Sequence, residues 1–207
     1  MLTTFRELFP FFSFYDRIFV KEGICMIKTS DILDEFDKRL RKKNNDVTFP
    51  LSKEKKKLIN DMLEHLYYSQ IEKYAKKYNL RPGMGLAAPQ LGINENFFVV
   101  CHEESDGIFK NYVMINPKMV SNSEELIYAS EGEGCLSVNR EVCGIVPRYA
   151  RVTFTGFDIE GKPIKIRARE ELAIAFQHEL DHLNGILFID RIDPKDPYKN
   201  KDYMREI

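Results

Sequence analysis

The sequence lacks an excess of charge of either sign. Its 31 Lys and Arg residues are balanced by 32 Asp and Glu residues, so the formal net charge of the 207-residue chain is −1 at pH 7. A protein that grips nucleic acid through its phosphates usually carries a clear positive excess. We therefore expect no direct nucleic-acid specificity. The remaining composition, 43% hydrophobic and 30% charged, is ordinary for a soluble globular enzyme of one domain.

Cysteine is also sparse. The four cysteines, at positions 25, 101, 135 and 143, are widely separated. Small secreted proteins that depend on disulfides carry closely spaced cysteines, and a chain of this length buries a core without them. We expect free thiols and a reducing, cytoplasmic setting.

Long apolar runs are missing as well. The segment LFPFFSFY at 8–15 is interrupted by Pro10, is flanked by charges and lacks a small-residue cleavage site. It is too short to cross a bilayer and does not match a signal peptide, so we expect no membrane association. The composition changes at Met26. We expect 1–25 to be an N-terminal extension outside the working domain, with Met26 as a candidate translation start. We expect residues 26–193 to form the working domain and 194–207 to be a charged C-terminal tail.

Apolar spacing predicts two helices in the first third of the chain. Ser30 or Asp31 is a suitable N-cap for a short helix, and Ser52 for a longer one that ends near Asn79. The tyrosines of the longer helix are expected in the core. The apolar faces comprise Ile32, Leu33, Phe36 and Leu40 in the short helix, and Ile59, Met62, Leu63, Leu66, Tyr74 and Tyr78 in the long one.

Strand-like segments follow from residue 96 onward. We expect strands at 97–101, 112–115 and 125–132, and a hairpin over 151–170 that turns at Glu160-Gly161. Helices at both ends with antiparallel strands between them indicate an α+β fold. The expected architecture is antiparallel sheets packed around a central metal-bearing helix, with further helices near the N-terminus.

That central helix is predicted over residues 170–185, EELAIAFQHELDHLNG. His178 and His182 are four residues apart, so both lie on one face, about 6 Å apart along the axis, where they can bind one metal ion. Glu179 points elsewhere and is better placed to reach a water than to be a ligand. The pattern on its own also occurs in helices whose histidines are only packed and hydrogen-bonded.

Cys135 is a candidate third ligand. It follows two glycines in EGEGCLSV at 131–138, a polar, loop-like segment. Most free cysteines are inert small hydrophobes. Together with two helix imidazoles, however, a loop thiolate gives three ligands and leaves one position open, as a metal that activates water requires.

The segment RPGMGLAAPQLG at 81–92 contains a misleading pattern. Gly83, Gly85 and Ala88 match the dinucleotide-binding motif G-x-G-x-x-A. That motif must follow a strand and open a helix, whereas a helix is predicted before it and Pro89 disfavours one after it. We interpret the segment as a place where backbone approaches a ligand closely, ending in the amide of Gln90.

Taken together, three segments resemble the signature motifs of peptide deformylase, in the same order. They are GMGLAAPQ at 83–90, EGCLS at 133–137 and QHELDH at 177–182. The resemblance extends from about Met26 through the final helix, and the form EGCLSV is similar to the subclass of Gram-positive bacteria. Met84 replaces a branched aliphatic residue, which bears only on pocket shape. Residues 1–25 have no counterpart.

The resemblance implies a metal-dependent hydrolase that removes the formyl group from the N-terminal formyl-methionine of new polypeptides. Cys135, His178 and His182 would bind Fe²⁺, with Zn²⁺, Ni²⁺ or Co²⁺ as possible substitutes. Glu179 would be the general acid and base. The partners implied are nascent N-formyl-methionyl peptides and a transient ribosome contact, and we expect a monomer.

The resemblance also implies roles around the metal. Gln90 and the backbone N–H of Leu136 would stabilise the oxyanion, and Gly85 would keep the pocket tight enough to admit formyl but not acetyl. The substrate's methionine side chain would enter a pocket at Ile174 and Ala175. Beside that pocket, Glu133 and Arg148 would form an ion pair. Asp181 would orient the site rather than act as a base.

Two other functions compete with this interpretation. An HExxH endopeptidase usually takes a carboxylate or a third histidine as its remaining ligand, and would leave EGCLS and GMGLAAPQ without a task. A structural metal module or a non-catalytic binder would normally close its site with four protein ligands.

Overall fold

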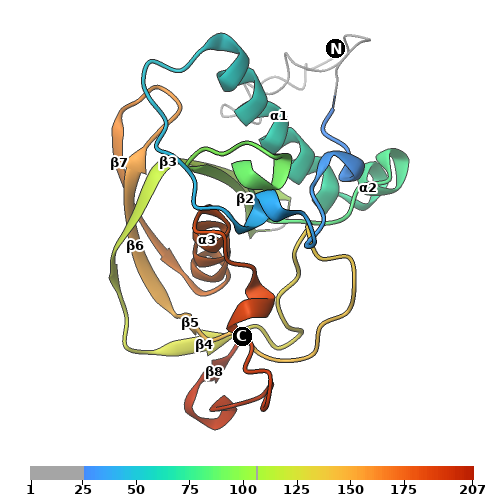
Figure 1. Ribbon diagram of the computed structural model, residues 1–207, viewed down its shortest axis with the longest axis vertical. Coiled ribbons are helices and arrows are strands. Elements are labelled where there is room, and N and C mark those ends of the chain that lie inside the picture. The colour runs from blue at the N-terminus through green and yellow to red at the C-terminus, as the bar shows by residue number, and fades with distance from the viewer. Residues whose placement is uncertain (1–25, 106) are drawn as a thin grey trace, which may run out of the picture.

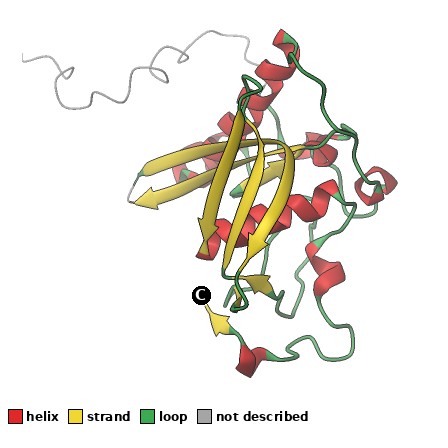
Figure 2. Ribbon diagram, turned by 90° about the vertical axis from the view of Figure 1, so that its left-hand side faces the viewer, coloured by secondary structure: helices red, strands yellow, loops and turns green. Residues whose placement is uncertain are grey.

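The computed structural model describes residues 26–105 and 107–207 (Figure 1). The predicted extension over 1–25 lies outside the described residues. Within them, five strands form an antiparallel sheet in the order β1-β2-β3-β6-β7, and three shorter strands form a second sheet in the order β5-β4-β8. Figure 2 shows the long strands as a curved layer with helical segments packed behind it. The α+β prediction is confirmed.

The large sheet contains β1 (Gly85–Ala87), β2 (Phe97–Ser105), β3 (Ile108–Asn122), β6 (Arg151–Phe157) and β7 (Pro163–Arg169). The small sheet contains β4 (Leu126–Tyr128), β5 (Arg148–Tyr149) and β8 (Arg205–Glu206). The helices are α1 (Lys53–Gln70), α2 (Glu72–Tyr78) and α3 (Glu170–Leu183). The predicted hairpin over 151–170 is present as β6 and β7, and the strand expected over 125–132 is present as the shorter β4. No described helix combines the length and apolar character that a membrane crossing needs.

The continuous apolar run of β2 has a simple cause, because both faces of this strand are covered. Phe97, Val99 and Cys101 belong to the core cluster under α1. Phe98 and Val100 belong to the cluster that also contains the apolar side of α3. Since successive side chains of a strand point to opposite faces, an alternating pattern would have left one of these clusters unfilled.

Helix α3 lies at the centre of the molecule (Figure 1). Its Phe176 is fully buried and meets the rings of Phe98, Tyr112 and Phe154 at centroid distances of 5.3, 5.6 and 5.4 Å. Edge-to-face ring packing of this kind adds about 0.5–1.5 kcal/mol per pair beyond area burial. The helix ends as predicted, and Gly185 follows it in a left-handed conformation with φ 76°. The metal-bearing helix is therefore held rigidly against the large sheet.

The short helix predicted from Ser30 to Leu40 is wrong. The segment forms two separate 3₁₀ turns, Thr29–Asp31 and Lys38–Arg41, and Phe36 is 82% exposed. The backbone N–H of Leu33 donates to the carbonyl of Gln90 at 2.8 Å. Tertiary contacts thus satisfy backbone groups that a helix would have paired internally.

The long helix near the N-terminus is correctly capped but is two helices. Ser52 Oγ accepts from the N–H of Lys55 at 3.2 Å, and Asn79 ends the second helix in a left-handed conformation. Between them Ile71 is extended, with φ −103° and ψ 110°. The change of direction leaves Tyr78 37% exposed, so the expectation that it lies in the core is wrong.

Several short elements were not predicted, among them β1, β5 and β8. The segment interpreted as a close-approach loop contains β1, which pairs with β2 at one edge of the large sheet, and a 3₁₀ turn over Ala88–Leu91. Residues 194–207, expected only as a charged tail, contain β8, which pairs in parallel with β4. The end of the described chain is thus part of the small sheet.

Candidate metal centre and active site

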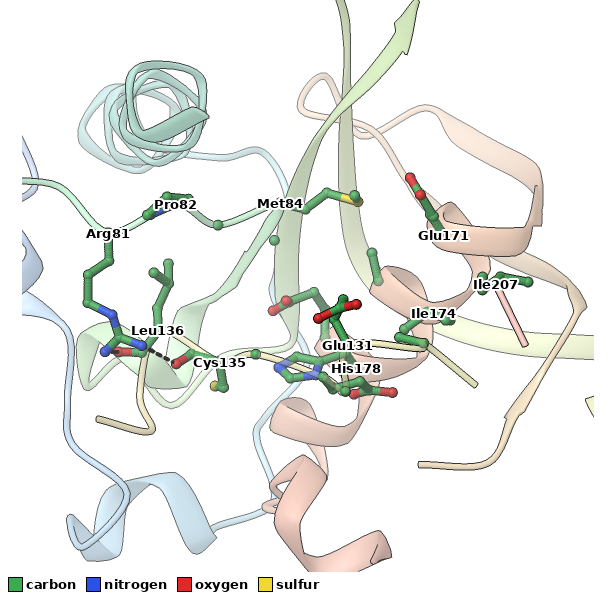
Figure 3. Close-up of a pocket in the computed structure, with 18 of the residues that line it drawn as sticks. Arg81, Pro82, Met84, Glu131, Cys135, Leu136, Glu171, Ile174, His178 and Ile207 are labelled. Carbon is green, nitrogen blue, oxygen red and sulfur yellow. Dashed lines mark hydrogen bonds and ion pairs between the residues drawn. The ribbon is translucent and has the colours of Figure 1, made fainter. Parts of the chain in front are cut away.

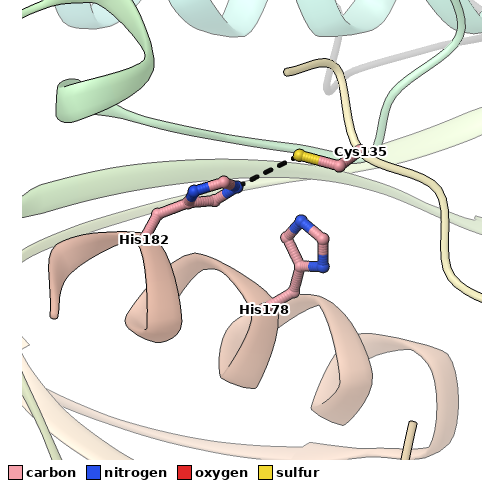
Figure 4. Close-up of side chains that lie close together, drawn as sticks. All are labelled: Cys135, His178 and His182. Carbon is pink, nitrogen blue, oxygen red and sulfur yellow. Dashed lines mark hydrogen bonds between the residues drawn. The ribbon is translucent and has the colours of Figure 1, made fainter. Parts of the chain in front are cut away.

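The three predicted ligands come together in the structure. His178 and His182 project from α3, and Cys135 lies in the loop between β4 and β5 (Figure 4). One ligand atom from each lies within 4.8 Å of the other two, and Nε2 of His182 is 3.3 Å from Sγ of Cys135. All three residues are buried, with 6%, 8% and 1% exposure for Cys135, His178 and His182. The helix spacing and the glycine-rich loop therefore converge on one point.

The electrostatics of this cluster favour a cation. Burial disfavours a charged His178, but hydrogen bonds to Cys135 and Glu133 outweigh it and raise the pKa of His178 well above 6.5. Burial, together with the charge of His178, lowers the pKa of His182 well below 6.5, so that ring is neutral and has a free lone pair. A thiolate and two imidazoles suit zinc, iron, cobalt or nickel. Among the described residues no fourth Cys, His, Asp or Glu joins the group, which leaves one position open.

A buried ionic network orients His178. Its Nδ1 donates to Oε2 of Glu133 at 2.9 Å, and Arg148 donates to the same carboxylate through Nε at 2.6 Å and Nη2 at 2.9 Å. The predicted ion pair between Glu133 and Arg148 is present. Burial raises the pKa of Glu133, but Arg148 and His178 outweigh it and hold that pKa at about 2. Because Glu133 accepts at Nδ1, His178 presents Nε2 to the metal position.

Arg148 extends this network away from the pocket. Its Nη1 donates to Oδ2 of Asp181 at 2.6 Å, and Arg191 also binds Asp181. Asp181 therefore contacts two guanidinium groups and does not line the pocket. Arg148 likewise lies behind the pocket wall rather than in it.

Glu179 faces the pocket with an unsatisfied oxygen. It is 3% exposed, and its Oε2 has no hydrogen-bond partner among the described residues. Burial raises the pKa of Glu179 to about 7. Gly85 makes room for this carboxylate, since a Cβ there would lie 2.3 Å from Oε1 of Glu179. A buried carboxyl group with an unused oxygen and this pKa is suited to proton transfer.

Gln90 is held in one orientation beside Cys135. Its Oε1 accepts from the N–H of Ala87 at 2.8 Å, so its Nε2 faces Ser137 Oγ at 3.2 Å and Cys135 Sγ at 3.7 Å. Gln90 and Leu136 both line the pocket. The 3₁₀ turn that begins at Ala88 brings the side-chain amide of Gln90 back over the end of β1. This turn makes the hydrogen bond from the N–H of Ala87 possible.

Sequence reasoning missed Arg81. Its Nη2 donates to the carbonyls of Cys135 and Val138, both at 3.0 Å, and its Nη1 also binds Asn139. Figure 3 shows this side chain reaching the Cys135 loop from the segment before β1. The sequence shows that Arg81 precedes the motif GMGLAAPQ. No spacing rule, however, links Arg81 to the Cys135 loop, which comes more than 50 residues later.

A pocket of about 510 Å³ is lined by Cys135, His178 and Glu179 together with Gln90 and Arg81. Of the predicted substrate-binding residues, Gly85, Glu133, Ile174 and Ala175 line it. Met84, the unusual residue of its motif, also lines it, as does Ile207, which sequence reasoning missed. Arg81 and Ile207 lie on opposite sides of the view in Figure 3.

Comparison with known proteins agrees with the geometry. The family model described as polypeptide deformylase matches residues 29–198. The peptide deformylase of Oceanobacillus iheyensis is 47% identical over 173 residues, which is 84% of this chain and 94% of that protein. The peptide deformylase of Shouchella clausii is 49% identical over 175 residues, 84% of this chain and 96% of that protein.

Solved structures give the same result. A plant peptide deformylase superposes with a TM-score of 0.67 at 28% identity, covering 89% of this chain and 90% of its own. A Synechococcus elongatus peptide deformylase in complex with actinonin has a TM-score of 0.66 at 34% identity, covering 79% of this chain and 80% of its own.

The relatives from Oceanobacillus, Shouchella and Listeria support the predicted Gram-positive-type subclass. Neither an endopeptidase nor a structural metal module accounts for this similarity over most of the chain. The chain belongs to the polypeptide deformylase family, metal-dependent hydrolases that remove the N-terminal formyl group from newly synthesised polypeptides.

Proposed function

We propose that this chain deformylates N-formyl-methionyl peptides with Glu179 as general base and acid, beside a metal held by Cys135, His178 and His182. The observation that carries the proposal is the unpartnered Oε2 of Glu179 in the pocket that Cys135 and His178 also line. A divalent metal held by these residues would supply a Lewis acid for water and the formyl group. The remaining work falls to the protein's own side chains.

Glu179 moves the proton. Its carboxylate accepts a proton from the attacking water and returns it to the departing amine nitrogen. A pKa of about 7 suits both steps, because a group that must accept and then donate works best near the operating pH.

Gln90 and Leu136 stabilise the oxyanion. The bond from the N–H of Ala87 fixes the amide of Gln90 beside Cys135, so that the hydrogen of Nε2 that makes only the long 3.7 Å contact with Sγ can donate to the oxyanion instead. The backbone N–H of Leu136 is the second donor. Each such donor typically contributes about 10²- to 10³-fold in rate.

The pocket selects formyl groups and methionine. Gly85 and the Glu179 carboxylate leave little space beside the reacting carbon, since even one added carbon at Gly85 would clash. Formyl carries only hydrogen where acetyl carries a methyl group, so acetyl is excluded. Ile174 and Ala175 offer the apolar surface for the methionine side chain. We also propose that actinonin, which is bound in the Synechococcus elongatus structure, binds to this chain in the same pocket.

Fe²⁺ is proposed as the native metal, with Zn²⁺, Ni²⁺ and Co²⁺ as substitutes. The mixed sulfur and nitrogen ligands accept all four, so availability decides. A ferrous thiolate centre is open to oxidation. Protein prepared without oxygen is expected to carry iron and to lose activity in air, whereas nickel-loaded protein stays active.

The cellular proposals follow from the substrate. Nascent chains are made in the cytoplasm, so we propose that the protein works there as a monomer with a transient ribosome contact. We also propose that 1–25 is dispensable for activity. Because β8 pairs with β4, the working domain is proposed to extend past 193 to Ile207.

Formate release from a formyl-Met-Ala-Ser peptide tests the catalytic proposal. Glu179→Ala is expected to lose about 10²- to 10⁴-fold in kcat while its metal content stays unchanged. Glu72→Ala, at a glutamate whose side chain is 80% exposed, is the matched control and is expected to keep full activity. A Glu179→Ala variant with wild-type kcat would overturn the proposal.

A further inference from the structure

Ile207 returns to the pocket from a segment far from the signature motifs. It lines the same cavity as Cys135, His178 and Glu179, and it is half-buried. Figure 3 shows it near Ile174, on the side away from Arg81. We propose that Ile207 is a specificity-determining residue that forms the second apolar wall of the site for the substrate's first side chain. This inference rests on the methionine pocket proposed above.

The backbone of Ile207 is fixed on both of its polar groups. Its N–H donates to the carbonyl of Tyr128 at 3.0 Å, and its carbonyl accepts from the N–H of Ser130 at 2.9 Å. These bonds continue the parallel pairing of β8 with β4. A one-residue slip would turn the side chain to the other face, so this register determines that isoleucine, rather than Glu206, faces the pocket.

Side chains of β8 anchor the segment to both elements that build the site. Arg205 donates to Glu125, just before β4, and to Glu170, the first residue of α3, both at 2.8 Å. The hydroxyl of Tyr128 donates to Glu206 at 2.5 Å. Each exposed ion pair contributes little alone. Together they tie Ile207 to the helix that carries Ile174 and to the strand that leads into the Cys135 loop.

The surroundings explain why an isoleucine matters there. Ile174 and Ala175 contribute apolar surface from α3, but two other lining residues, Glu131 and Glu171, are charged and exposed. A thioether chain that packed only against Ile174 and Ala175 would have these charged residues among the other residues that line its pocket. Ile207 supplies apolar surface in their place, and the loss of a few carbons from such a wall changes specificity about 10-fold or more.

The test uses the full chain loaded with nickel and compares a formyl-Met-Ala-Ser peptide with a formyl-Ala-Ala-Ser peptide. Ile207→Ala is expected to lower kcat/KM for the methionine peptide about 10-fold, through KM with kcat nearly unchanged. For the alanine peptide the change is expected to stay under about 2-fold, because a methyl group does not reach this wall. Ile207→Val is expected to keep most of the preference.

Tyr203→Ala is the matched control, since Tyr203 lies in the same segment, is 86% exposed and is not among the pocket-lining residues. If the wild-type protein shows no preference for the methionine peptide, both the proposed methionine pocket and this inference are wrong. A wild-type preference that Ile207→Ala leaves unchanged overturns the inference alone. An equal loss for both peptides also overturns it, because that pattern reports damage to the fold.

Discussion

Gly85 leaves the space that the carboxylate of Glu179 occupies. A Cβ at Gly85 would lie 2.3 Å from Oε1 and 2.7 Å from Cδ of Glu179, closer than any real contact. The two residues come from β1 and α3, more than ninety positions apart. The glycine motif and the histidine helix therefore depend on each other through one carboxylate.

Gly85→Ala is expected to displace Glu179 and lower kcat by about 10²-fold, since a shift of about 1 Å in a catalytic group has that effect. The atoms nearest to a Cβ at Gly85 all belong to Glu179, so we expect metal content to stay near wild type. Formate release and metal analysis measure both quantities.

A double-mutant cycle shows whether the clash is the cause. In a Glu179→Ala background the space opposite Gly85 is open, so adding Gly85→Ala is expected to cost little in unfolding free energy. An equal cost of Gly85→Ala with and without Glu179 would show that the carboxylate is not what Gly85 accommodates.

Glu179→Gln is expected to stabilise the metal-free protein at high pH. Burial raises the pKa of Glu179 from 4.5 to about 7. Below pH 4.5 the group is protonated in both the folded and unfolded states and costs nothing. Between pH 4.5 and 7 it ionises in the unfolded chain first, so the folded state loses stability, reaching roughly 3 kcal/mol above pH 7. Glutamine cannot ionise and avoids this loss.

Urea unfolding of both proteins in the presence of a chelator measures the difference. The difference should be near zero at pH 4 and largest at pH 8, and Glu179→Gln is expected to lose most of the activity. Equal unfolding free energies at pH 8 would contradict the raised pKa.

Glu133→Gln is expected to weaken metal binding by about 10- to 100-fold, because the neutral amide no longer orients His178 and leaves Arg148 without its carboxylate partner. Competition with a chromophoric chelator measures the affinity. Glu141→Gln, an exposed glutamate of the same loop, is the control and should bind metal as wild type does. Unchanged affinity in Glu133→Gln would mean that the network does not support the ligand.

Arg81→Lys is expected to speed metal loss and lower kcat/KM. A lysine lacks the planar guanidinium group whose Nη2 donates to the carbonyls of both Cys135 and Val138. Arg167→Lys, at an exposed arginine of β7, is the control. For both variants and the wild type, the rate of metal dissociation and kcat/KM are measured. A variant with a normal dissociation rate and normal kcat/KM would show that the loop holds its shape without Arg81.

Thiol labelling should distinguish three cysteines. Cys143 is exposed and should react with iodoacetamide in all samples. Cys101 is buried, and burial raises its pKa to about 12, so it should stay unlabelled in the folded protein. Cys135 should be protected when metal is bound and react after metal removal, because it lines the pocket. Peptide mass mapping measures all three, and labelling of Cys135 at equal rates with and without metal would contradict its role as a ligand.

The sequence by itself determined the metal-bearing helix, its two histidines and the candidate third ligand. Helical spacing places His178 and His182 on one face of any helix, and the apolar residues elsewhere in 172–183 require that helix to be buried. The positions of β2, β3, β4 and the β6–β7 hairpin were also predictable, because short apolar runs bounded by turn residues act locally, although β3 extends over Ile108–Asn122 where only 112–115 was expected.

Only the tertiary structure decided the rest. Residues 30–40 failed to form a helix because Leu33 pairs with Gln90 across the fold, and the long helix broke at Ile71 without a local signal. Arg81 and Ile207 reach the pocket through hydrogen bonds to the Cys135 loop and to β4. Such long-range pairings leave no periodicity in the chain, because they depend on which surfaces the folded elements bring together.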